Sequence, residues 1–134
     1  KAMEAGQVGV DATALARGLQ AEGKIALYGV FFDSGKSELK PESKPQLDEM
    51  AKLLQANAAM RVFVVGHTDN QGALDANLAL SRARAQAVVD ALAKTYKVDA
   101  KRLAAAGVAN YSPLASNAND AGRARNRRVE LVLQ

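Results

Sequence analysis

Residues 60–92 read MRVFVVGHTDNQGALDANLALSRARAQAVVDAL. The segment 60–66 is almost entirely apolar and rich in valine, which predicts a buried strand. Polar residues then form a loop at 67–72, and apolar residues recur every three or four positions from 74 to about 96, which predicts a long helix. A strand, a polar loop and an amphipathic helix in this order are typical of an α/β protein.

The flanking sequence repeats this alternation. Apolar runs at 24–32 (KIALYGVFF) and 103–108 predict two further buried strands, and 127–133 (RRVELVL) alternates in the manner of a last strand. A helix is expected from Pro41 to about residue 55, and 109–122 is expected to be a polar loop. The order βαβαβ-β predicts a two-layer α/β sandwich, a mixed sheet of about four strands covered on one side by helices. Helical crossovers make the first three strands parallel, whereas the last is free to be antiparallel.

Residues 1–23 are expected to form a lead-in that precedes the main domain at 24–134. Within it we predict an alanine-rich helix at 12–22, because Asp11 is suited to cap its start and Gly23 to stop it. This helix adds one N-terminal element to the fold. The sequence leaves open whether it packs on the edge of the sheet or serves as a spacer from a membrane.

The composition narrows the chemistry that the chain can perform. The 134 residues suffice for one compact domain, and the absence of cysteine excludes disulfides, cysteine-based zinc sites and thiol catalysis. His67 is the only histidine, which excludes a metal site built from several histidines. The net charge of +4 favours an anionic partner. We expect no metal and no cofactor.

No segment approaches the roughly 18 apolar residues that a membrane-spanning helix needs. The sequence also begins without an initiator methionine or a signal peptide. We therefore expect it to be part of a longer precursor whose anchor lies outside this sequence.

Polar residues gather where the predicted strand at 60–66 ends. Ligands bind at such strand ends in open α/β sheets, so Asp69 in the following loop is a candidate binding residue. The predicted long helix presents an apolar stripe to the sheet, made of Leu74, Leu78, Ser81, Ala85, Val88 and Leu92. Asn77 and Arg84 lie at the border of this stripe, about 50–70° from its centre. Helical side chains lean toward the N-terminus, so we expect Arg84 to reach toward Asp69.

Asp69 and Arg84 are complementary to the two charged groups of an amino acid. A carboxylate accepts hydrogen bonds from an ammonium group, and a guanidinium binds a carboxylate through two parallel hydrogen bonds. A cleft that presents both groups is suited to a zwitterion. Asp33, at the end of the first predicted strand, adds a second candidate acceptor.

The residues alone also allow other interpretations of these charges. Asp69 and Arg84 are compatible with a structural ion pair that fastens the loop to the helix, and Asp33 with a cap for the next turn. The arginines within 123–128 are compatible with a nucleic-acid patch. No aromatic platform accompanies them, so we expect no nucleic-acid partner.

The same region carries a longer pattern. Thr68-Asp69 is followed after ten residues by Leu80-Ser81, and then by Arg84-Ala85, Val88 and Leu92 at intervals of two, two and three residues. This run resembles the signature of the OmpA-like peptidoglycan-binding domains, the type also found in Pal and MotB. The resemblance covers residues 26–133, and it includes FFD at 31–33, GH at 66–67, Asn77 and NRRVE at 126–130.

The resemblance implies a ligand and a site. Domains of this family hold the free amine and carboxylate of meso-diaminopimelate in the stem peptide of peptidoglycan. The ligand-binding residues implied are Asp69 for the amine, Arg84 for the carboxylate, and Asp33, Thr68 and Asn77 as supporting contacts. One arginine of the pair 127–128 is also implied near the ligand, and strand alternation leads us to favour Arg128. Neither catalysis nor a metal or cofactor is implied.

The resemblance further implies a setting. The expected partner is peptidoglycan, which places the domain in the periplasm. Its parent is expected to be tied to the outer membrane by a lipid, as a lipoprotein, or by a barrel, although anchoring in the inner membrane also occurs in the family. The alternative is an envelope protein–protein interaction module, in which the cleft or the 109–122 loop docks a partner or a second copy. An enzyme acting on the wall is disfavoured, because no acid and base residues stand in a recognisable arrangement.

Overall fold

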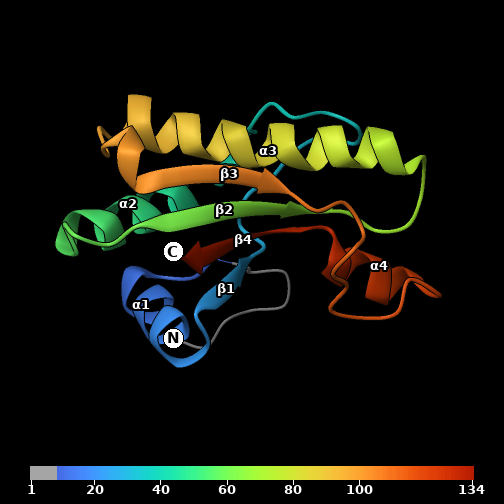
Figure 1. Ribbon diagram of the computed structural model, residues 1–134, viewed down its shortest axis with the longest axis horizontal. Helices are drawn as coiled ribbons and strands as arrows, with labels where there is room; N and C mark the ends of the chain where they lie inside the picture. Colours follow the sequence, from blue (N-terminus) through green and yellow to red (C-terminus); the bar gives the residue numbers. More distant parts are fainter. Residues whose placement is uncertain (1–8) are drawn as a thin grey trace.

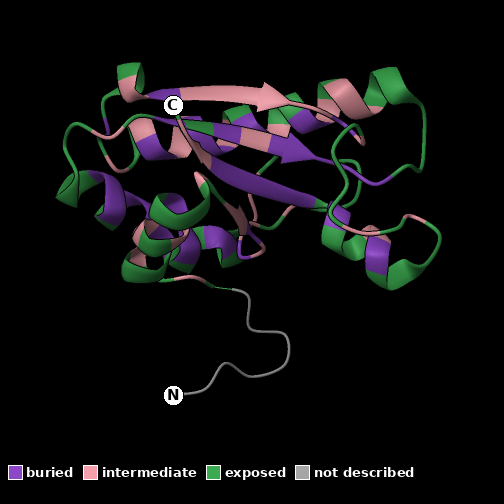
Figure 2. Ribbon diagram, turned by 60° about the horizontal axis from the view of Figure 1, so that its bottom comes forward, coloured by how far each residue is buried: buried purple, intermediate pink, exposed green. Residues whose placement is uncertain are grey.

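The computed structural model describes residues 9–134. Over this range the chain forms two layers, a four-stranded sheet and a set of helices packed against one of its faces (Figures 1 and 2). The strands are β1 (Lys24–Leu27), β2 (Val62–His67), β3 (Leu103–Gly107) and β4 (Arg128–Leu133). The helices are α1 (Ala12–Glu22), α2 (Lys44–Ala56), α3 (Leu74–Lys94) and α4 (Asp120–Asn126), with short 3-10 turns η1 (Pro41–Ser43) and η2 (Ala100–Arg102). The predicted α/β sandwich with an additional N-terminal helix is confirmed.

The strand order in the sheet is β1-β4-β2-β3. β2 and β3 pair in parallel, whereas β4 pairs antiparallel with both β1 and β2. The predicted mixed sheet, with its first three strands in one direction and the last opposed, is therefore confirmed. Because β4 lies between β1 and β2, the last strand of the sequence is an inner strand of the sheet and joins β1 to the other strands (Figure 1).

The core lies between the sheet and the helices α1, α2 and α3. It is built largely from leucine, valine and alanine. Its largest fully buried apolar side chains are Leu15 and Leu19 of α1, Leu27 of β1, Met50, Leu53 and Leu54 of α2, Val62 and Val64 of β2, Val88 and Leu92 of α3, and Leu131 of β4. Full burial of one such side chain contributes about 1.5–3 kcal/mol, so this layer supplies most of the hydrophobic stabilisation.

α1 is part of this core. Asp11 caps its first turn by accepting a 2.8 Å hydrogen bond from the backbone N–H of Ala14, and Gly23 ends it in the left-handed conformation with φ 75°. Both signals predicted from the sequence are confirmed. Leu15 and Leu19 are buried, and α1 contacts both α2 and β1, so the helix packs on the domain and does not project from it as a spacer.

α3 approaches the sheet closely at two glycines. A side chain at Gly66 of β2 would collide with the backbone carbonyl of Ser81, and one at Gly107 of β3 would collide with the backbone nitrogen of Arg82. The short distance lets the hydroxyl of Ser81 accept a 3.2 Å hydrogen bond from the backbone N–H of Ala109. The helix is therefore fixed to the sheet at the end where the β2–α3 loop begins.

The strand predicted at 24–32 is shorter in the structure. β1 ends at Leu27, and residues 28–32 leave the sheet. Leu27 pairs with Val129, next to the first residue of β4, so no neighbouring strand continues alongside β1 beyond this point. The backbone N–H of Phe31 instead donates a 2.8 Å hydrogen bond to the hydroxyl of Ser43. This departure from the sheet opens a space beside α3.

The polar loop predicted at 109–122 ends in a helix that the sequence analysis missed. α4 begins after Asn119, whose side chain accepts a 2.7 Å hydrogen bond from the backbone N–H of Gly122. The side chain of Asn126, at the end of α4, is fully buried and hydrogen-bonds backbone groups of the preceding loop. α4 thus holds the preceding loop in place next to the start of β4.

The predicted apolar stripe of the long helix is confirmed except at its start. Ser81, Ala85, Val88 and Leu92 are buried, whereas Leu74 is 42% exposed. The first turn of α3 extends beyond the ends of β2 and β3, where no sheet covers it (Figure 1). Other boundaries differ slightly from the prediction, with β2 starting at Val62, α3 ending at Lys94, β3 ending at Gly107 and β4 starting at Arg128.

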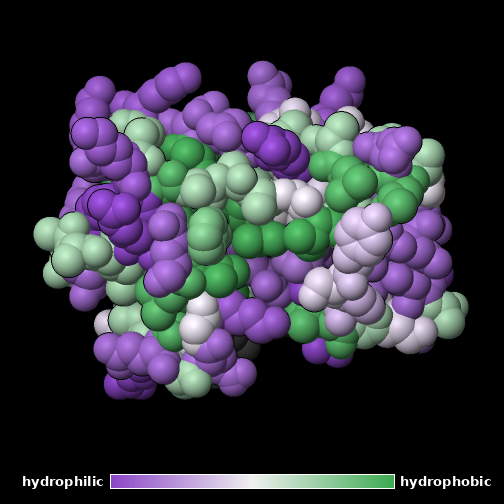
Figure 3. All heavy atoms as spheres, viewed as in Figure 1, coloured by the Kyte–Doolittle hydropathy of each residue, from purple (hydrophilic) through white to green (hydrophobic). Residues whose placement is uncertain are grey.

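The sheet face opposite the helices is open. Phe63 lies between the core residues Val62 and Val64, so it projects onto this face, where it is 39% exposed. Figure 3 shows apolar side chains gathered in the middle of the face that Figure 1 presents. Within residues 9–134, no helix has the length and hydropathy to cross a bilayer, and no group of His, Asp or Glu side chains is arranged to hold a metal ion.

Candidate ligand-binding pocket

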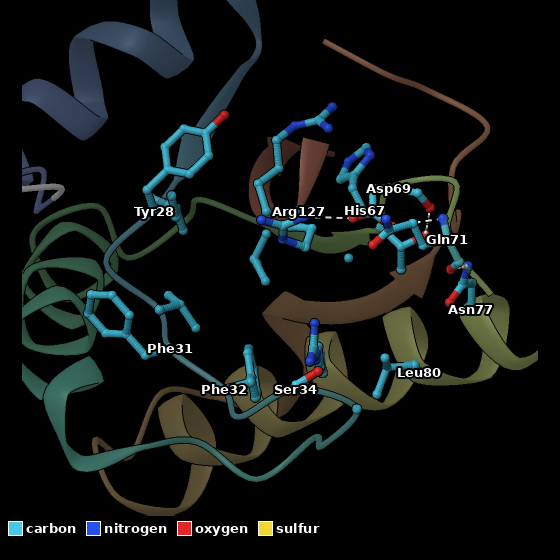
Figure 4. A pocket seen from close by; sticks show the side chains of 18 residues that line it. Tyr28, Phe31, Phe32, Ser34, His67, Asp69, Gln71, Asn77, Leu80 and Arg127 are labelled. Atoms are coloured by element: carbon cyan, nitrogen blue, oxygen red, sulfur yellow. Dashed lines mark hydrogen bonds and ion pairs between the residues drawn. The ribbon is translucent and has the colours of Figure 1, made fainter. Parts of the chain in front are cut away.

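A pocket of about 680 Å³ lies beside the carboxyl end of β2. Four segments form its walls: the end of β1 with the chain that follows it, the loop between β2 and α3, one face of α3, and the junction between α4 and β4. Figure 4 shows His67, Asp69 and Arg127 grouped on one side, with Phe31 and Phe32 on the other. Of the predicted ligand-binding residues, Thr68, Asp69, Asn77, Arg84 and Arg128 line this pocket, and Asp33 does not.

Asp69 is held by the loop that follows β2. The backbone N–H of Thr68 donates a 2.8 Å hydrogen bond to the carbonyl of Ala109, and the backbone N–H of Gln71 donates to Asp69 Oδ1 at 2.9 Å. The second oxygen, Oδ2, accepts from Arg127 Nη1 at 2.7 Å. The Asp69 side chain is only 8% exposed, and the hydrogen bond from the Gln71 backbone fixes the position of its carboxylate.

Arg84 lies against the ring of Phe32. Its Nε donates to the carbonyl of Lys36 at 2.8 Å and its Nη2 to the carbonyl of Asp33 at 3.1 Å. The guanidinium carbon is 5.0 Å from the centroid of the Phe32 ring, within cation–π range. Burial, and then the nearby charge of Arg127, lower the pKa of Arg84, but a guanidinium stays charged at neutral pH.

The structure brings Asp69 and Arg84 into one pocket but does not pair them with each other. Among residues 9–134, no carboxylate forms an ion pair with Arg84. The interpretation of Asp69 and Arg84 as a structural ion pair is therefore wrong. Arg84 bonds instead to backbone carbonyls of the chain after β1, because that chain leaves the sheet at Leu27 and passes beside α3.

The two arginines of the pair 127–128 have different environments. Arg127 caps the C-terminus of α4, and its half-exposed side chain pairs with Asp69. Arg128 is the first residue of β4, and its 1% exposed side chain bonds to Glu130 and to two backbone carbonyls. Our preference for Arg128 assumed that both residues lie on a strand. Because β4 begins only at Arg128, strand alternation does not relate them, and Arg127 is the arginine of the pair whose side chain in the pocket is half-exposed.

Arg128, Glu130 and His67 form a buried cluster next to the pocket. Arg128 Nε donates to Glu130 Oε2 at 2.8 Å, and His67 Nε2 lies 3.4 Å from Glu130 Oε1 without forming a well-aligned hydrogen bond. Burial by itself would raise the pKa of Glu130, but His67 and Arg128 together lower it to about 2. His67 and Arg128 are also partners in the β2–β4 ladder, so the cluster fixes the strands that carry Asp69 and Arg127 at their ends.

Thr68 and Asn77 support the loop that carries Asp69. Thr68 is buried, and its hydroxyl donates a 2.8 Å hydrogen bond to the carbonyl of Asp69. The side-chain amide of Asn77 donates to the carbonyl of Gln71 at 2.8 Å. Both side chains line the pocket. Their hydrogen bonds to the carbonyls of Asp69 and Gln71 also hold the loop in position.

Asp33 is placed differently from the prediction. Its side chain is 70% exposed and forms a 3.3 Å ion pair with Lys40, so its carboxylate does not line the pocket. Its backbone carbonyl accepts a hydrogen bond from Arg84. Asp33 thus helps to position Arg84 through its main chain. A main-chain contact of this kind does not depend on the side chain, so the sequence gives no sign of it.

Sequence reasoning missed part of the pocket wall. Phe32 was noted only as a flanking residue, yet it supports the guanidinium of Arg84. Tyr28 and Gln71 carry no motif and also line the pocket. A predicted strand that included residue 28 gave no reason to place that side chain at a site.

The charges define what the pocket can bind. Arg84 and Arg127 bring two positive charges and Asp69 one negative charge, while the charge of Arg128 is balanced by Glu130. Among residues 9–134, Arg84 has no carboxylate as an ion-pair partner. Guanidinium groups bind carboxylates and phosphates through paired hydrogen bonds, and a carboxylate binds an ammonium group. The pocket therefore suits a small ligand that carries an anionic group, with a cationic group beside it.

These features define a two-layer α/β domain whose pocket presents separated cationic and anionic groups to a ligand. The model of the OmpA family matches residues 31–127. The chain belongs to the OmpA family.

Relatives share most of this chain but are longer. The outer membrane protein Omp38 of Acinetobacter baumannii is 44% identical over 100 residues, which cover 75% of this chain and 28% of that protein. The probable lipoprotein YiaD of Escherichia coli is 41% identical over 104 residues, covering 78% of this chain and 47% of that protein. The peptidoglycan-binding protein ArfA of Mycobacterium bovis is 38% identical over 104 residues, covering 78% and 32%. The chain therefore spans less than half the length of these relatives.

Solved structures show the same fold. The cell wall anchor of the T6SS from Pseudomonas aeruginosa is 34% identical with a TM-score of 0.71, and the match covers 95% of this chain and 98% of that one. The peptidoglycan-associated lipoprotein from Burkholderia pseudomallei is 29% identical with a TM-score of 0.71, covering 85% of this chain and 92% of that one. The first match nearly spans both chains.

Proposed function

We propose that this domain binds peptidoglycan non-covalently and so anchors its parent envelope protein to the cell wall. The ligand group is the free end of meso-diaminopimelate in a stem peptide. Asp69 receives its amine and Arg84 its carboxylate, while Thr68 and Asn77 hold the loop around Asp69. Asp33 acts through its backbone carbonyl on Arg84. Arg128 supports the site from the buried cluster with Glu130.

The observation that carries this proposal is the state of Arg84. Its guanidinium is held by two backbone carbonyls and the Phe32 ring, and no carboxylate of the described chain neutralises it. A partly buried charge without a counter-ion is costly, and an anionic ligand removes that cost. Asp69 in the same pocket adds a site for an amine. The family, together with the names of the peptidoglycan-binding protein ArfA and the Burkholderia peptidoglycan-associated lipoprotein, supports peptidoglycan as the source of such a ligand.

The test is calorimetric titration of the domain with a muropeptide that contains meso-diaminopimelate. We expect saturable binding by the wild type. Asp69→Ala and Arg84→Ala should each weaken it by about 2–5 kcal/mol, because each leaves one charged group of the ligand without a partner.

Asp33→Ala is the matched control, since it also removes a carboxylate near the site but one that faces Lys40. Its affinity should stay within a factor of about three of the wild type, as for loss of an exposed ion pair. Normal affinity in both Asp69→Ala and Arg84→Ala, with the fold intact by NMR, would reject the proposed site.

The proposed setting is the periplasm, with the parent protein attached to the outer membrane. The similarity to Omp38, which is named an outer membrane protein, and to YiaD, which is named a probable lipoprotein, supports this location. The proposal involves no chemical step, because the pocket holds its charges for recognition and the single histidine is buried against Glu130. Fractionation of cells that express the parent protein, with and without digestion of the wall, tests the location.

A second candidate is a protein–protein interaction module. Tyr111 is 67% exposed and Leu114 is 40% exposed, and both lie on the 109–122 loop. Exposed aromatic and aliphatic side chains on a folded loop are typical of contact surfaces. Capture of one envelope protein that is lost in Tyr111→Ala, with no muropeptide binding by the wild type, would favour this candidate over the first.

A further inference from the structure

We propose that Arg127 determines the specificity of this pocket: by pairing with Asp69 in the free protein it excludes plain amines, and it admits an amine only when a carboxylate enters with it. The inference rests on the proposed function and deepens it. Asp69 and Arg84 supply the contacts, and Arg127 sets the condition for reaching Asp69.

Both oxygens of Asp69 are engaged before any ligand arrives. The backbone N–H of Gln71 donates to Oδ1 at 2.9 Å, and Arg127 Nη1 donates to Oδ2 at 2.7 Å. The Asp69 side chain is 8% exposed, which leaves little surface for a further donor. Each oxygen has a second lone pair, but Arg127 is the exposed partner of this buried carboxylate, so we infer that an ammonium group reaches Asp69 by displacing Arg127.

Arg127 is placed so that it can be displaced. Its side chain is 48% exposed, and its one side-chain hydrogen bond to the described residues is the bond to Asp69. A half-exposed ion pair of this kind contributes little net stability, because water and ions stabilise the separated charges almost as well. The neighbouring Arg128 differs in each respect, since its side chain is 1% exposed and bonds to Glu130.

The balance of charge gives the exchange its selectivity. Arg84, Arg127 and Asp69 give the pocket a net charge of about +1 when each group has its usual charge at neutral pH, because the charge of Arg128, which also lines the pocket, is balanced by Glu130. A plain amine that takes Asp69 releases Arg127 and adds a positive charge beside two guanidinium groups. A zwitterion leaves the net charge unchanged, because its carboxylate meets Arg84 and the released Arg127 as its amine takes Asp69.

Two tripeptides test this selection with a change of one group. L-Ala-γ-D-Glu-meso-diaminopimelate and L-Ala-γ-D-Glu-L-Lys both end in an amine, and only the first has a carboxylate beside it. The wild type should bind the diaminopimelate peptide and discriminate against the lysine peptide. Arg127→Gln should bind the lysine peptide about five- to tenfold more tightly than the wild type does and lose about tenfold for the diaminopimelate peptide. The ratio of the two affinities should thus fall strongly.

Two variants control the experiment. Arg125→Gln removes the same charge from an exposed position of α4 and should leave the ratio unchanged. Arg127→Lys keeps a charge that can pair with Asp69 and should retain most of the discrimination. An Arg127→Gln protein with the wild-type ratio, or with equal losses for both peptides, would overturn the inference while leaving the proposed function standing. A wild type that binds neither peptide would reject both.

Discussion

Glu130 links the stability of the domain to pH through a single buried carboxylate. Its pKa is lowered to about 2 in the folded protein, whereas an exposed glutamate titrates near pH 4.3. A lowered pKa means that the folded state favours the charged form. Glu130 therefore stabilises the fold above about pH 4.3, and this contribution is lost as the pH falls toward 2.

Glu130→Gln is expected to lower the free energy of unfolding at pH 7 by about 3–5 kcal/mol, because it leaves the buried Arg128 without a counter-charge. Urea denaturation at pH 7, 5, 4 and 3 measures this, and the gap between wild type and variant should narrow at the lowest pH. Glu42→Gln is the control, since its 61% exposed side chain forms only a 3.9 Å contact with Lys40. A gap that is constant with pH would contradict the role given to Glu130.

At the scale of single residues, the sequence predicted which charges share a pocket but not how they are paired. Asp69 and Arg84 could be placed together because the end of a strand and one face of a helix follow from periodicity. The partner of Asp69 could not be predicted, because Arg127 reaches it only after α4 and β4 have been positioned. The exposed direction of the Asp33 side chain likewise depends on Lys40, a contact made within an irregular segment.

The close contact of α3 with the sheet makes a prediction at the scale of elements. Gly66→Ala and Gly107→Ala should each destabilise the domain by about 3 kcal/mol or more, because the added methyl meets the backbone of α3, which cannot yield as a flexible side chain can. Thermal and urea unfolding measure the change. Gly9→Ala, where an added methyl meets nothing within 4 Å, should be nearly neutral. Stable Gly66→Ala and Gly107→Ala proteins would show that α3 can move away from the sheet.

α1 makes a second prediction at this scale. Leu15→Ala should cost about 2–5 kcal/mol of unfolding free energy, because Leu15 is fully buried. Gln20→Ala, on the exposed side of the same helix, should change it by less than about 0.5 kcal/mol. Equal effects of the two substitutions in urea denaturation would mean that α1 is not part of the cooperative core.

The elements themselves were predictable where apolar periodicity is strong. The two caps of α1, the buried β2 and the stripe of α3 follow from local patterns that the structure confirms. The end of β1 was not predictable, because residues 28–32 are as apolar as a strand and leave the sheet only for lack of a pairing partner. α4 was missed because its seven residues include three charged side chains and little apolar pattern.

The net charge of +4 makes a prediction at the scale of the whole molecule. Retention of the domain on intact cell wall should fall when salt rises from about 0.05 to 0.3 M, because the Debye length shortens and long-range attraction to an anionic polymer is screened. Binding of a single short stem peptide should change much less, since its contacts are short-range. Co-sedimentation with purified wall and calorimetry with the peptide measure the two. Equal salt dependence would show that the overall charge plays no part in recruitment to the wall.

The place of β4 in the sheet bears on how the domain comes into being as a nascent chain. β1 is complete at residue 27, but its partner in the sheet consists of residues 128–133, so β1 joins the sheet only when these two distant segments meet. Closing so long a loop is slow, and Arg127 can reach Asp69 only when the chain up to the start of β4 is available. An emerging chain therefore cannot pair β1 with its neighbour in the sheet until its last strand is available.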